Sequence, residues 1–225
     1  MMNKTFDFLS LLQSNNNREW FFEHMDDYED LHYAFEKKID YLISLISTFD
    51  PDVEYLTGRD CSWRIFKDFA FVDSDSIFKT CFEAFLARGG KKSPYCGYIL
   101  HVEPGNCFIG GGLWAPETAL LQQLRKDVYE HFSEFQDIIN EPVISTTYSH
   151  FDRKGMLRNL PSQYPKDFER TDLLMLDTYR VIAPVPDSFF ENEFWPEVLA
   201  EKYKCLLPLH NFLNIRVEDY VRKRY

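Results

Sequence analysis

The densest group of residues that could do chemistry lies near the start of the chain, in the stretch NNNREWFFEH. Trp20, His24 and Tyr28 are four residues apart, so a helix would place them on one face. Asn17 is a strong N-cap, because its side chain accepts a hydrogen bond from the next turn. Arg18 would then stand at a helix N-terminus, which favours negative charge. The spacing favours a packed helix face with a half-buried, hydrogen-bonded histidine. The alternative is a binding site in which Arg18 contacts an anion at the helix N-terminus.

A second candidate pair is Arg64 and Asp68, within an aromatic-rich stretch that we expect to be a strand over residues 63–71. Alternate residues of a strand share one face, so the two side chains would lie together. An arginine on the floor of a pocket binds a carboxylate or phosphate through two parallel N–H donors. The alternative is a structural ion pair or a cross-strand pair.

His101 and Glu103 also share a strand face, and with His24 they offer nitrogen and oxygen donors to a metal. No recognised ligand spacing supports such a site, so we expect neither a metal nor a cofactor. The five cysteines include no CxxC pair and no catalytic signature. We therefore expect reduced, mostly buried thiols in a reducing compartment, and a cytoplasmic protein.

Two common catalytic motifs are excluded by their spacing. Gly110-Gly111-Gly112 lacks both the GxGxxG spacing and the Lys-Ser/Thr pair of phosphate-binding loops. Three glycines before Trp114 instead indicate a bulge or a close backbone approach. No GxSxG elbow is present.

The composition limits the classes of partner. The 225-residue chain carries a net charge of −11 and has an isoelectric point of about 5.0. Binding to nucleic acid or anionic lipid requires a dense basic face, so we expect neither as a partner. No run of 18 apolar residues is present, which argues against a membrane span. Aromatic residues make up 17% of the chain, which favours core packing over a stacking surface.

The periodicity predicts helices at both ends of the chain. A short amphipathic helix is expected over 5–13, and a second, long one from Asn16 or Asn17 to near Phe49, before Pro51. Further helices are expected from Ala115, over 133–140 and 169–176, and over 187–224 with interruptions at Pro196 and Pro208.

Strands are expected in the middle of the chain, over 63–71, 79–87, 95–103, 106–114, 142–148 and 179–185, with a loop over 149–167. Glu103-Pro104-Gly105-Asn106 is a turn sequence. Helices and strands do not alternate, so we predict an α+β fold. A central, mainly antiparallel sheet would pack against the long N-terminal helix and the C-terminal helices, in a single domain over residues 1–225.

Three pieces of sequence in this order resemble DUF2461, a family of conserved uncharacterised proteins. The first comprises Asn16, Asn17, Arg18, Trp20, Phe21, His24 and Tyr28. The second corresponds to the family's Arg-x-x-Arg-Asp-x-Arg-Phe segment, and the third runs from Tyr98 to Gly105 and from Gly110 to Pro116. The resemblance spans nearly the whole chain, with a weak echo at 157–161, and implies a fold but no reaction.

The departures from the family pattern concern its cationic residues. Arg64, Asp68 and Lys79 match, whereas Lys67 and Ala70 replace arginines. The resemblance therefore implies a divergent member that has lost much of a cationic cluster. If relatives hold an anion there, the binding should be weaker or redirected in this chain.

Two hypotheses remain. The first is a binding domain for a small molecule, with an anion as a candidate ligand, or an enzyme with a degraded site. Its pocket would lie between the long N-terminal helix and the sheet, lined by Arg18, Trp20, His24, Arg64, Asp68, Tyr98 and Trp114. The second is a non-catalytic interaction or scaffold domain with part of its aromatic surplus on a partner surface.

Overall fold

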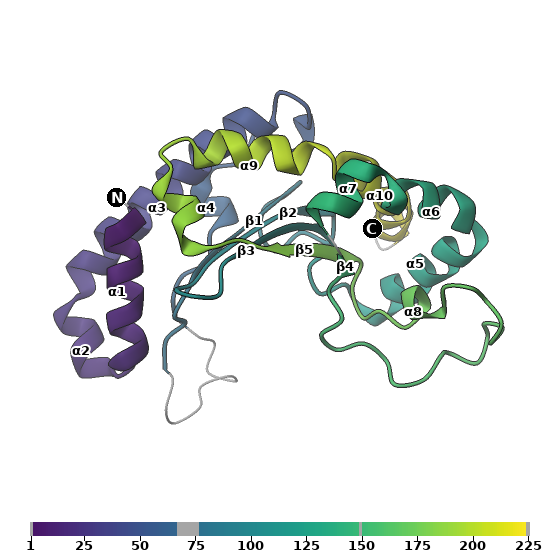
Figure 1. Ribbon diagram of the computed structural model, residues 1–225, viewed down its shortest axis with the longest axis horizontal. Helices are drawn as coiled ribbons and strands as arrows, with labels where there is room; N and C mark the ends of the chain where they lie inside the picture. The colour runs from purple at the N-terminus through teal and green to yellow at the C-terminus, as the bar shows by residue number, and fades with distance from the viewer. Residues whose placement is uncertain (1, 67–76, 149, 224–225) are drawn as a thin grey trace. The chain divides into compact units, whose positions relative to one another are not determined.

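The computed structural model describes residues 2–66, 77–148 and 150–223, and its architecture is α+β as predicted (Figure 1). The chain separates into two compact units, each built from three segments. The first unit comprises Met1–Lys92, Ile99–Ile109 and Pro184–Glu201, and the second comprises Ser93–Tyr98, Gly110–Ala183 and Lys202–Tyr225. The expectation of a single domain stays a prediction.

Three helices open the first unit: α1 (Met2–Ser14), α2 (Arg18–Glu23) and α3 (Met25–Ile46). Asn17 caps α2 as expected, and its side chain accepts a hydrogen bond from the Trp20 amide at 3.0 Å. The prediction of one long helix from this cap is wrong, because the chain leaves helical geometry at His24. Apolar residues recur across the break, so periodicity did not reveal it.

Aromatic rings join α1 to the two helices that follow it, and the ribbons of α1 and α2 lie side by side in Figure 1. The Phe8 ring lies 5.7 Å from Trp20 and 6.4 Å from Tyr28, measured between centroids. Phe21 is fully buried, with its ring 5.4 Å from that of Tyr28. The aromatic surplus here serves packing, which is its commoner role.

Two short helices follow α3: the 3₁₀ helix η1 (Pro51–Val53) and α4 (Gly58–Cys61). A Cβ on Gly58 would lie 2.1 Å from the Glu36 carbonyl oxygen, so only glycine allows α4 to approach α3 this closely. The expected strand over 63–71 is wrong in its described part, where only isolated bridges form, Ser62↔Ala84 and Phe66↔Phe78. Residues 67–71 lie outside the described residues.

The sheet has the strand order β1-β2-β3-β5-β4. Its strands are β1 (Phe82–Ala87), β2 (Gly97–Val102), β3 (Phe108–Gly112), β4 (His150–Phe151) and β5 (Arg180–Pro184). The β4 and β5 strands pair antiparallel, with His150 opposite Ile182. A Cβ on Gly110 would lie 2.2 Å from the Val181 carbonyl oxygen, which confirms that the glycine run permits a close backbone approach.

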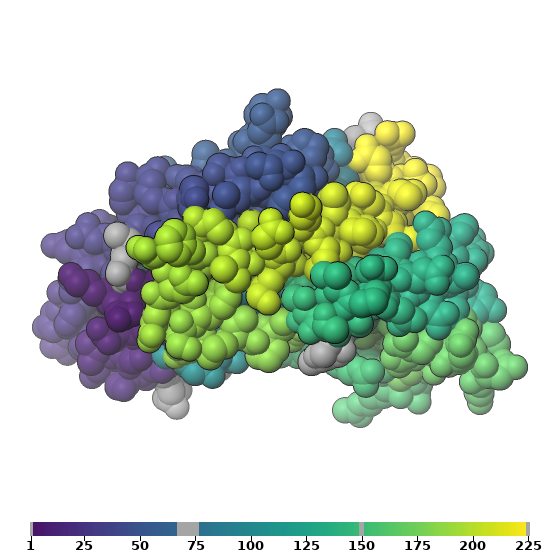
Figure 2. All heavy atoms as spheres, turned by 45° about the horizontal axis from the view of Figure 1, so that its top comes forward, coloured from purple at the N-terminus to yellow at the C-terminus, as the bar shows by residue number. Residues whose placement is uncertain are grey.

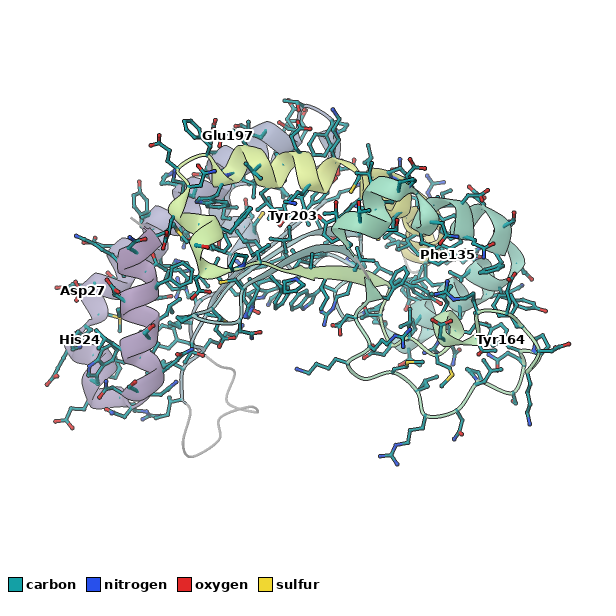
Figure 3. All side chains as sticks on the ribbon, viewed as in Figure 1. His24, Asp27, Phe135, Tyr164, Glu197 and Tyr203 are labelled. Carbon is teal, nitrogen blue, oxygen red and sulfur yellow. The ribbon has the colours of Figure 1, made fainter. Side chains whose placement is uncertain are left out.

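Four helices of the second unit lie between β3 and β5: α5 (Thr118–Glu130), α6 (Phe132–Asn140), α7 (Pro142–Thr147) and α8 (Thr171–Leu174). The predicted strand over 142–148 is wrong, since this segment is α7. Its β-branched residues favour a strand, but Pro142 suits the first turn of a helix and the Thr146 hydroxyl donates to the Pro142 carbonyl at 2.6 Å. Phe135, labelled in Figure 3, lies in this unit's core with Phe151 and Tyr179.

The chain ends in η3 (Asp187–Glu191), α9 (Trp195–Lys204) and α10 (Leu207–Arg222). Pro196 and Pro208 stand in the first turns of α9 and α10, so they begin these helices rather than interrupt one. In the first unit, the Tyr41 hydroxyl of α3 donates to Glu197 of α9 at 2.8 Å. Figure 2 shows the blue segment that contains α3 beside the yellow-green segment that contains α9. Over the ranges the structure describes, no helix combines the length and apolar character that a membrane crossing needs.

Candidate functional site

A cleft of about 860 Å³ lies within the first unit. One wall is α3, which contributes Tyr28 and His32; another is the segment from α4 through Arg64; the third is the loop that carries Lys91 and Lys92. The capping box of α4 and the close contact at Gly58 hold the second wall against the first.

Among the described residues, the cleft carries four cationic side chains: Arg59, Arg64, Lys91 and Lys92. Lys91 donates a hydrogen bond to the Arg59 carbonyl oxygen at 2.7 Å. Within the described residues, neither the Arg59 nor the Arg64 guanidinium has a hydrogen-bond or ion-pair partner. Both arginines are exposed, so their donors are accessible to a ligand.

Two acidic residues of the cleft, Asp60 and Glu36, are more fully engaged. Asp60 accepts hydrogen bonds from the Thr57 hydroxyl at 2.7 Å and from the Thr57 amide at 2.9 Å. These bonds lower the pKa of the Asp60 carboxyl. A Glu36 oxygen lies 3.4 Å from His32 Nδ1, one turn of helix apart. The cleft therefore presents uncommitted guanidinium groups beside Asp60 and Glu36, which already have partners, and also contains the exposed Glu29.

His32 is the titratable base of the cleft. Its Nε2 lies 3.1 Å from the Trp63 carbonyl oxygen. Burial lowers the pKa of His32 below its ordinary value of 6.5, and the nearby Arg64 and Lys91 charges add to this, against the opposing effects of Glu36 and the Trp63 carbonyl. At neutral pH the imidazole is thus uncharged, and it gains a charge only in acid.

Aromatic side chains flank the cations. Tyr28 is buried, and its hydroxyl accepts a hydrogen bond from the Ile65 amide at 3.3 Å. Burial raises the pKa of the Tyr28 phenol, so the group stays neutral. Phe66 stands edge-on to Tyr28, and Tyr33 is 61% exposed at the cleft. Exposed ring faces next to cations suit a ligand with both a planar part and an anionic part.

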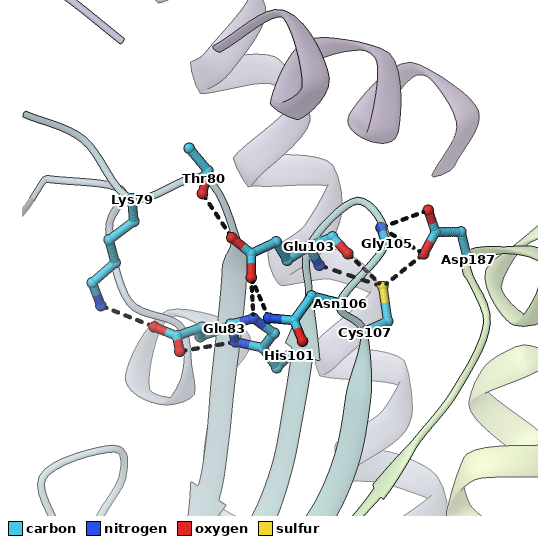
Figure 4. Close-up of polar contacts among 9 residues, drawn as sticks. All are labelled: Lys79, Thr80, Glu83, His101, Glu103, Gly105, Asn106, Cys107 and Asp187. Carbon is cyan, nitrogen blue, oxygen red and sulfur yellow. Dashed lines mark hydrogen bonds and ion pairs between the residues drawn. The ribbon is translucent and has the colours of Figure 1, made fainter. Parts of the chain in front are cut away.

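A second cluster lies where β1 and β2 run beside each other, also within the first unit (Figure 4). His101 Nδ1 lies 3.0 Å from a Glu83 oxygen, and its Nε2 lies 3.2 Å from a Glu103 oxygen. The imidazole stacks on Phe108, with 4.4 Å between the ring centroids. Carboxylates only accept, so both ring nitrogens can donate at once only in the imidazolium form.

Each carboxylate of this cluster has further partners. The Lys79 ammonium lies 2.9 Å from Glu83, and Thr80 and Asn106 donate to Glu103 at 2.7 and 2.6 Å. Burial alone would raise the pKa of Glu83, but the hydrogen bond from His101 and the charge of Lys79 outweigh it and hold the pKa at about 2. For Glu103, bonds from Asn106, Thr80 and His101 likewise outweigh burial and lower its pKa.

The turn after β2 places part of this second cluster. Its closing bond runs from the Asn106 amide to the Glu103 carbonyl at 2.9 Å, and Gly105 has a φ of +74°. Pro104 and Gly105 occupy the two central positions as the sequence predicted, since glycine tolerates a positive φ there. The turn thereby places the side-chain amide of Asn106 where it donates a hydrogen bond to the Glu103 carboxylate.

Of the residues expected from the sequence, Tyr28 and Arg64 line the cleft, and Lys79, His101 and Glu103 belong to the second cluster. Asn17 and Arg18 lie exposed at the start of α2 and do not line the cleft. Tyr98 and Trp114 belong to the second unit, and Asp68 lies outside the described residues.

Trp20 and His24 pack on each other at the end of α2. Their rings stack with centroids 4.1 Å apart, and His24 Nδ1 lies 2.8 Å from the Trp20 carbonyl oxygen. Figure 3 labels His24 at this junction. The half-buried, hydrogen-bonded histidine considered from the sequence is thus the arrangement found.

In the second unit, Tyr98 packs against Tyr203 and His210, with ring centroids 5.0 and 4.7 Å away. The Arg180 guanidinium lies over the Trp114 ring, 4.7 Å from its centroid. Both predicted residues are thereby engaged within their own unit.

Sequence reasoning missed Arg59, His32, Lys91, Lys92 and Glu83. The Gly-Gly-Lys-Lys loop was a visible signal for the lysines, because it placed two adjacent charges on a turn. Glu83 was visible as the single charge in the apolar run of β1. For Arg59 and His32 no local pattern exists, since their role depends on how α3 and α4 pack.

A smaller hollow of about 190 Å³ lies in the second unit. It holds Arg153 and Arg170, but both pair with Asp172, at 3.3 and 2.9 Å. Its cations are already committed, in contrast to those of the larger cleft.

The profile of a family of conserved hypothetical proteins (DUF2461) matches residues 4–212, which is most of the chain. No curated protein is significantly similar to the chain, and no solved structure is either.

Proposed function

We propose that this chain, which belongs to the DUF2461 family of conserved hypothetical proteins, binds a small anionic molecule in its first unit. The binding site is the cleft between α3, α4 and the Lys91–Lys92 loop. The observation that carries the proposal is the pair of guanidinium groups, Arg59 and Arg64, without partners among the described residues. A protein with a net charge of −11 has many carboxylates with which to pair its arginines, so two uncommitted ones in a cleft favour an external anion.

The surroundings of the two arginines narrow the ligand class. Phe66 and Tyr33 offer exposed apolar faces beside the charges, and the neutral Tyr28 stands below them. We infer a planar ligand that carries a phosphate or carboxylate group, because its ring would lie on the aromatic side chains and its charge on the arginines.

The departures from the family pattern agree with a redirected site. Arg64 is retained, whereas the matching Lys79 is taken up by Glu83 at 2.9 Å. Arg59 lies outside the matched motif and supplies a second guanidinium. The cationic groups of this chain therefore differ in position from those that the resemblance implies.

The cysteines support a cytoplasmic location. All five lie in the described part of the chain and none forms a disulfide. Burial raises the pKa of Cys61 and of Cys107 to about 12, which keeps both thiols protonated and unreactive. The acidic net charge supports the absence of nucleic-acid and anionic-lipid partners.

A thermal-shift screen with paired compounds tests the proposal. Each anion is matched with its uncharged counterpart: adenosine monophosphate with adenosine, and benzoate with benzamide. A ligand at a hundred times its dissociation constant adds about 2.7 kcal/mol to the free energy of unfolding. That should raise the midpoint by roughly 5–10 °C for a chain of this size.

We expect a shift with the anions and none with their neutral partners. Equal behaviour of the two members of every pair would contradict the proposal. It would favour the alternative of an interaction or scaffold domain, whose partner surface would include exposed aromatic residues such as Tyr55, at 90% exposure.

A further inference from the structure

We propose that Cys81, Glu83 and His101 form a site for a divalent transition-metal ion, of which zinc is the type, with Glu103 supporting the histidine. One donor atom from each of the three residues lies within 4.8 Å of the other two. All lie in the first unit, and none lines the anion cleft. The inference is therefore independent of the proposed function.

Strand geometry accounts for the convergence. Glu83 is the second residue of β1, and Cys81 precedes it by two, which is the spacing that returns a side chain to the same side. His101 is on β2, the neighbouring strand, directly beside Glu83 at 3.0 Å. No sequential ligand motif joins Cys81, which directly precedes β1, with Glu83 on β1 and His101 on β2. The metal candidates considered from the sequence included His101 but neither Cys81 nor Glu83.

The donor set suits zinc. Bonds of 2.0–2.3 Å in a tetrahedron separate ligand atoms by roughly 3.3–3.8 Å. The His101 and Glu83 donor atoms are 3.0 Å apart, and all three donors lie within 4.8 Å of one another. Adjustment of the side-chain torsions of Cys81 and Glu83 would bring the three donors to tetrahedral separations. A thiolate with an imidazole selects zinc or cobalt over magnesium or calcium, which prefer oxygen ligands alone.

His101 is held as a metal-binding histidine usually is. A metal between Nδ1 and Glu83 would leave the Nε2 proton to be donated to Glu103, at 3.2 Å. Histidine ligands commonly donate their second nitrogen to a carboxylate, which fixes the ring and its tautomer. Thr80 and Asn106 hold Glu103 in place, and the Phe108 ring fixes the plane of the imidazole.

The two carboxylate oxygens of Glu83 have different partners. Its Oε2 pairs with Lys79, while its Oε1 faces His101 and is the atom placed to bind the metal. The competing account is an ion-pair network in which an imidazolium bridges two carboxylates. That network needs no sulfur donor, so the two accounts differ in what Cys81 does.

Cobalt absorption spectroscopy on the chelator-treated, full-length protein separates the two accounts. Co²⁺ bound to a thiolate gives an intense sulfur-to-metal charge-transfer band, which oxygen and nitrogen ligands do not give. We expect the wild-type band to saturate at one equivalent of Co²⁺ and to be displaced by Zn²⁺. Absence of the band in the wild-type protein would overturn the proposal without any variant.

Variants then assign the donors. Cys81→Ser should abolish the band, whereas Cys205→Ser, a matched change in the second unit, should leave it unchanged. Glu103→Gln should keep the band but weaken Zn²⁺ binding about 10- to 100-fold, as removal of a supporting carboxylate does. A band that survives Cys81→Ser in a folded variant would overturn the site, and Arg64→Ala should leave the titration unaltered.

Discussion

At the scale of single residues, the role of an arginine is decided by its neighbours rather than by its type. Arg18 and Arg64 have the same chemistry, yet Arg18 lies exposed at the start of a six-residue helix and Arg64 lines a cleft. The sequence indicated both arginines as candidate ligand-binding residues, because residue type and family pattern can be recognised from a short stretch of sequence. Which arginine reaches a cleft depends on the packing of α3 against α4, which is long-range information.

His32 should make anion binding depend on pH. Burial lowers its pKa below the ordinary histidine value of 6.5, so it is neutral at pH 7 and becomes positive only in more acidic solution. The added charge should strengthen the binding of sulfate, whose own charge is constant over this range. The measurement is calorimetric titration between pH 5 and 8. We expect affinity to rise toward low pH in the wild type and to stay flat in His32→Gln; a flat wild-type profile would count against His32.

Acid should strengthen anion binding through His32 but should lower the stability of the fold through the same residue. A base whose pKa is lowered in the folded state binds fewer protons than it does in the unfolded chain. The free energy of unfolding therefore falls as the pH drops below 6.5. A bound anion that pairs with the imidazolium would offset part of this loss.

At the scale of the elements, predictions succeeded where a local rule was sufficient. The turn at Pro104-Gly105 and the helix over 133–140 followed from residue types and from periodicity. Prediction failed where two local rules conflicted, as in α7, whose β-branched residues favour a strand and whose proline favours a helix start. It failed again at His24, where the apolar pattern continues through the break between α2 and α3.

The capping box at the start of α4 includes Asp60, which also lines the cleft. Thr57→Ala removes a helix cap and should cost about 1 kcal/mol, which lowers the melting midpoint by roughly 2–4 °C. The Asp60 carboxylate accepts hydrogen bonds from the Thr57 hydroxyl and from the Thr57 backbone amide in the wild type. The substitution removes the bond from the hydroxyl and so partly releases this carboxylate. The released carboxylate can then compete with an anion for Arg59.

Thermal unfolding and anion titration check this prediction. We expect Thr57→Ala to lose both stability and affinity. Thr48→Ala is the control, because Thr48 is exposed at the end of α3 and only donates to the Leu45 carbonyl. If the two variants bind the anion equally well, Asp60 plays no part in ligand selection.

At the scale of the whole molecule, composition predicted more about what is absent than about what is present. The acidic charge and the hydropathy argued against nucleic-acid and membrane partners, and no described helix has the character of a membrane span. The α+β class followed from the order of elements. The cleft did not, because its three walls are separate segments of the chain that meet only in the fold.

The metal-binding cluster was also beyond composition and spacing. Its residues come from two strands, 18 positions apart at Glu83 and His101, and only strand pairing brings them together. The family match shows which family the chain belongs to but gives no reaction. The proposals about function are therefore argued from the sites themselves.

The most direct test of the anion cleft is calorimetric titration of the best anion from the screen into the wild type, Arg64→Ala and Arg18→Ala. Loss of a charged hydrogen-bond donor costs about 1.5–3 kcal/mol. Since 1.4 kcal/mol corresponds to a factor of ten, we expect Arg64→Ala to weaken binding by roughly 10- to 100-fold. Arg18→Ala, the same change outside the cleft, should bind as the wild type does. Equal affinities for all three proteins would contradict the assignment of the cleft as the binding site.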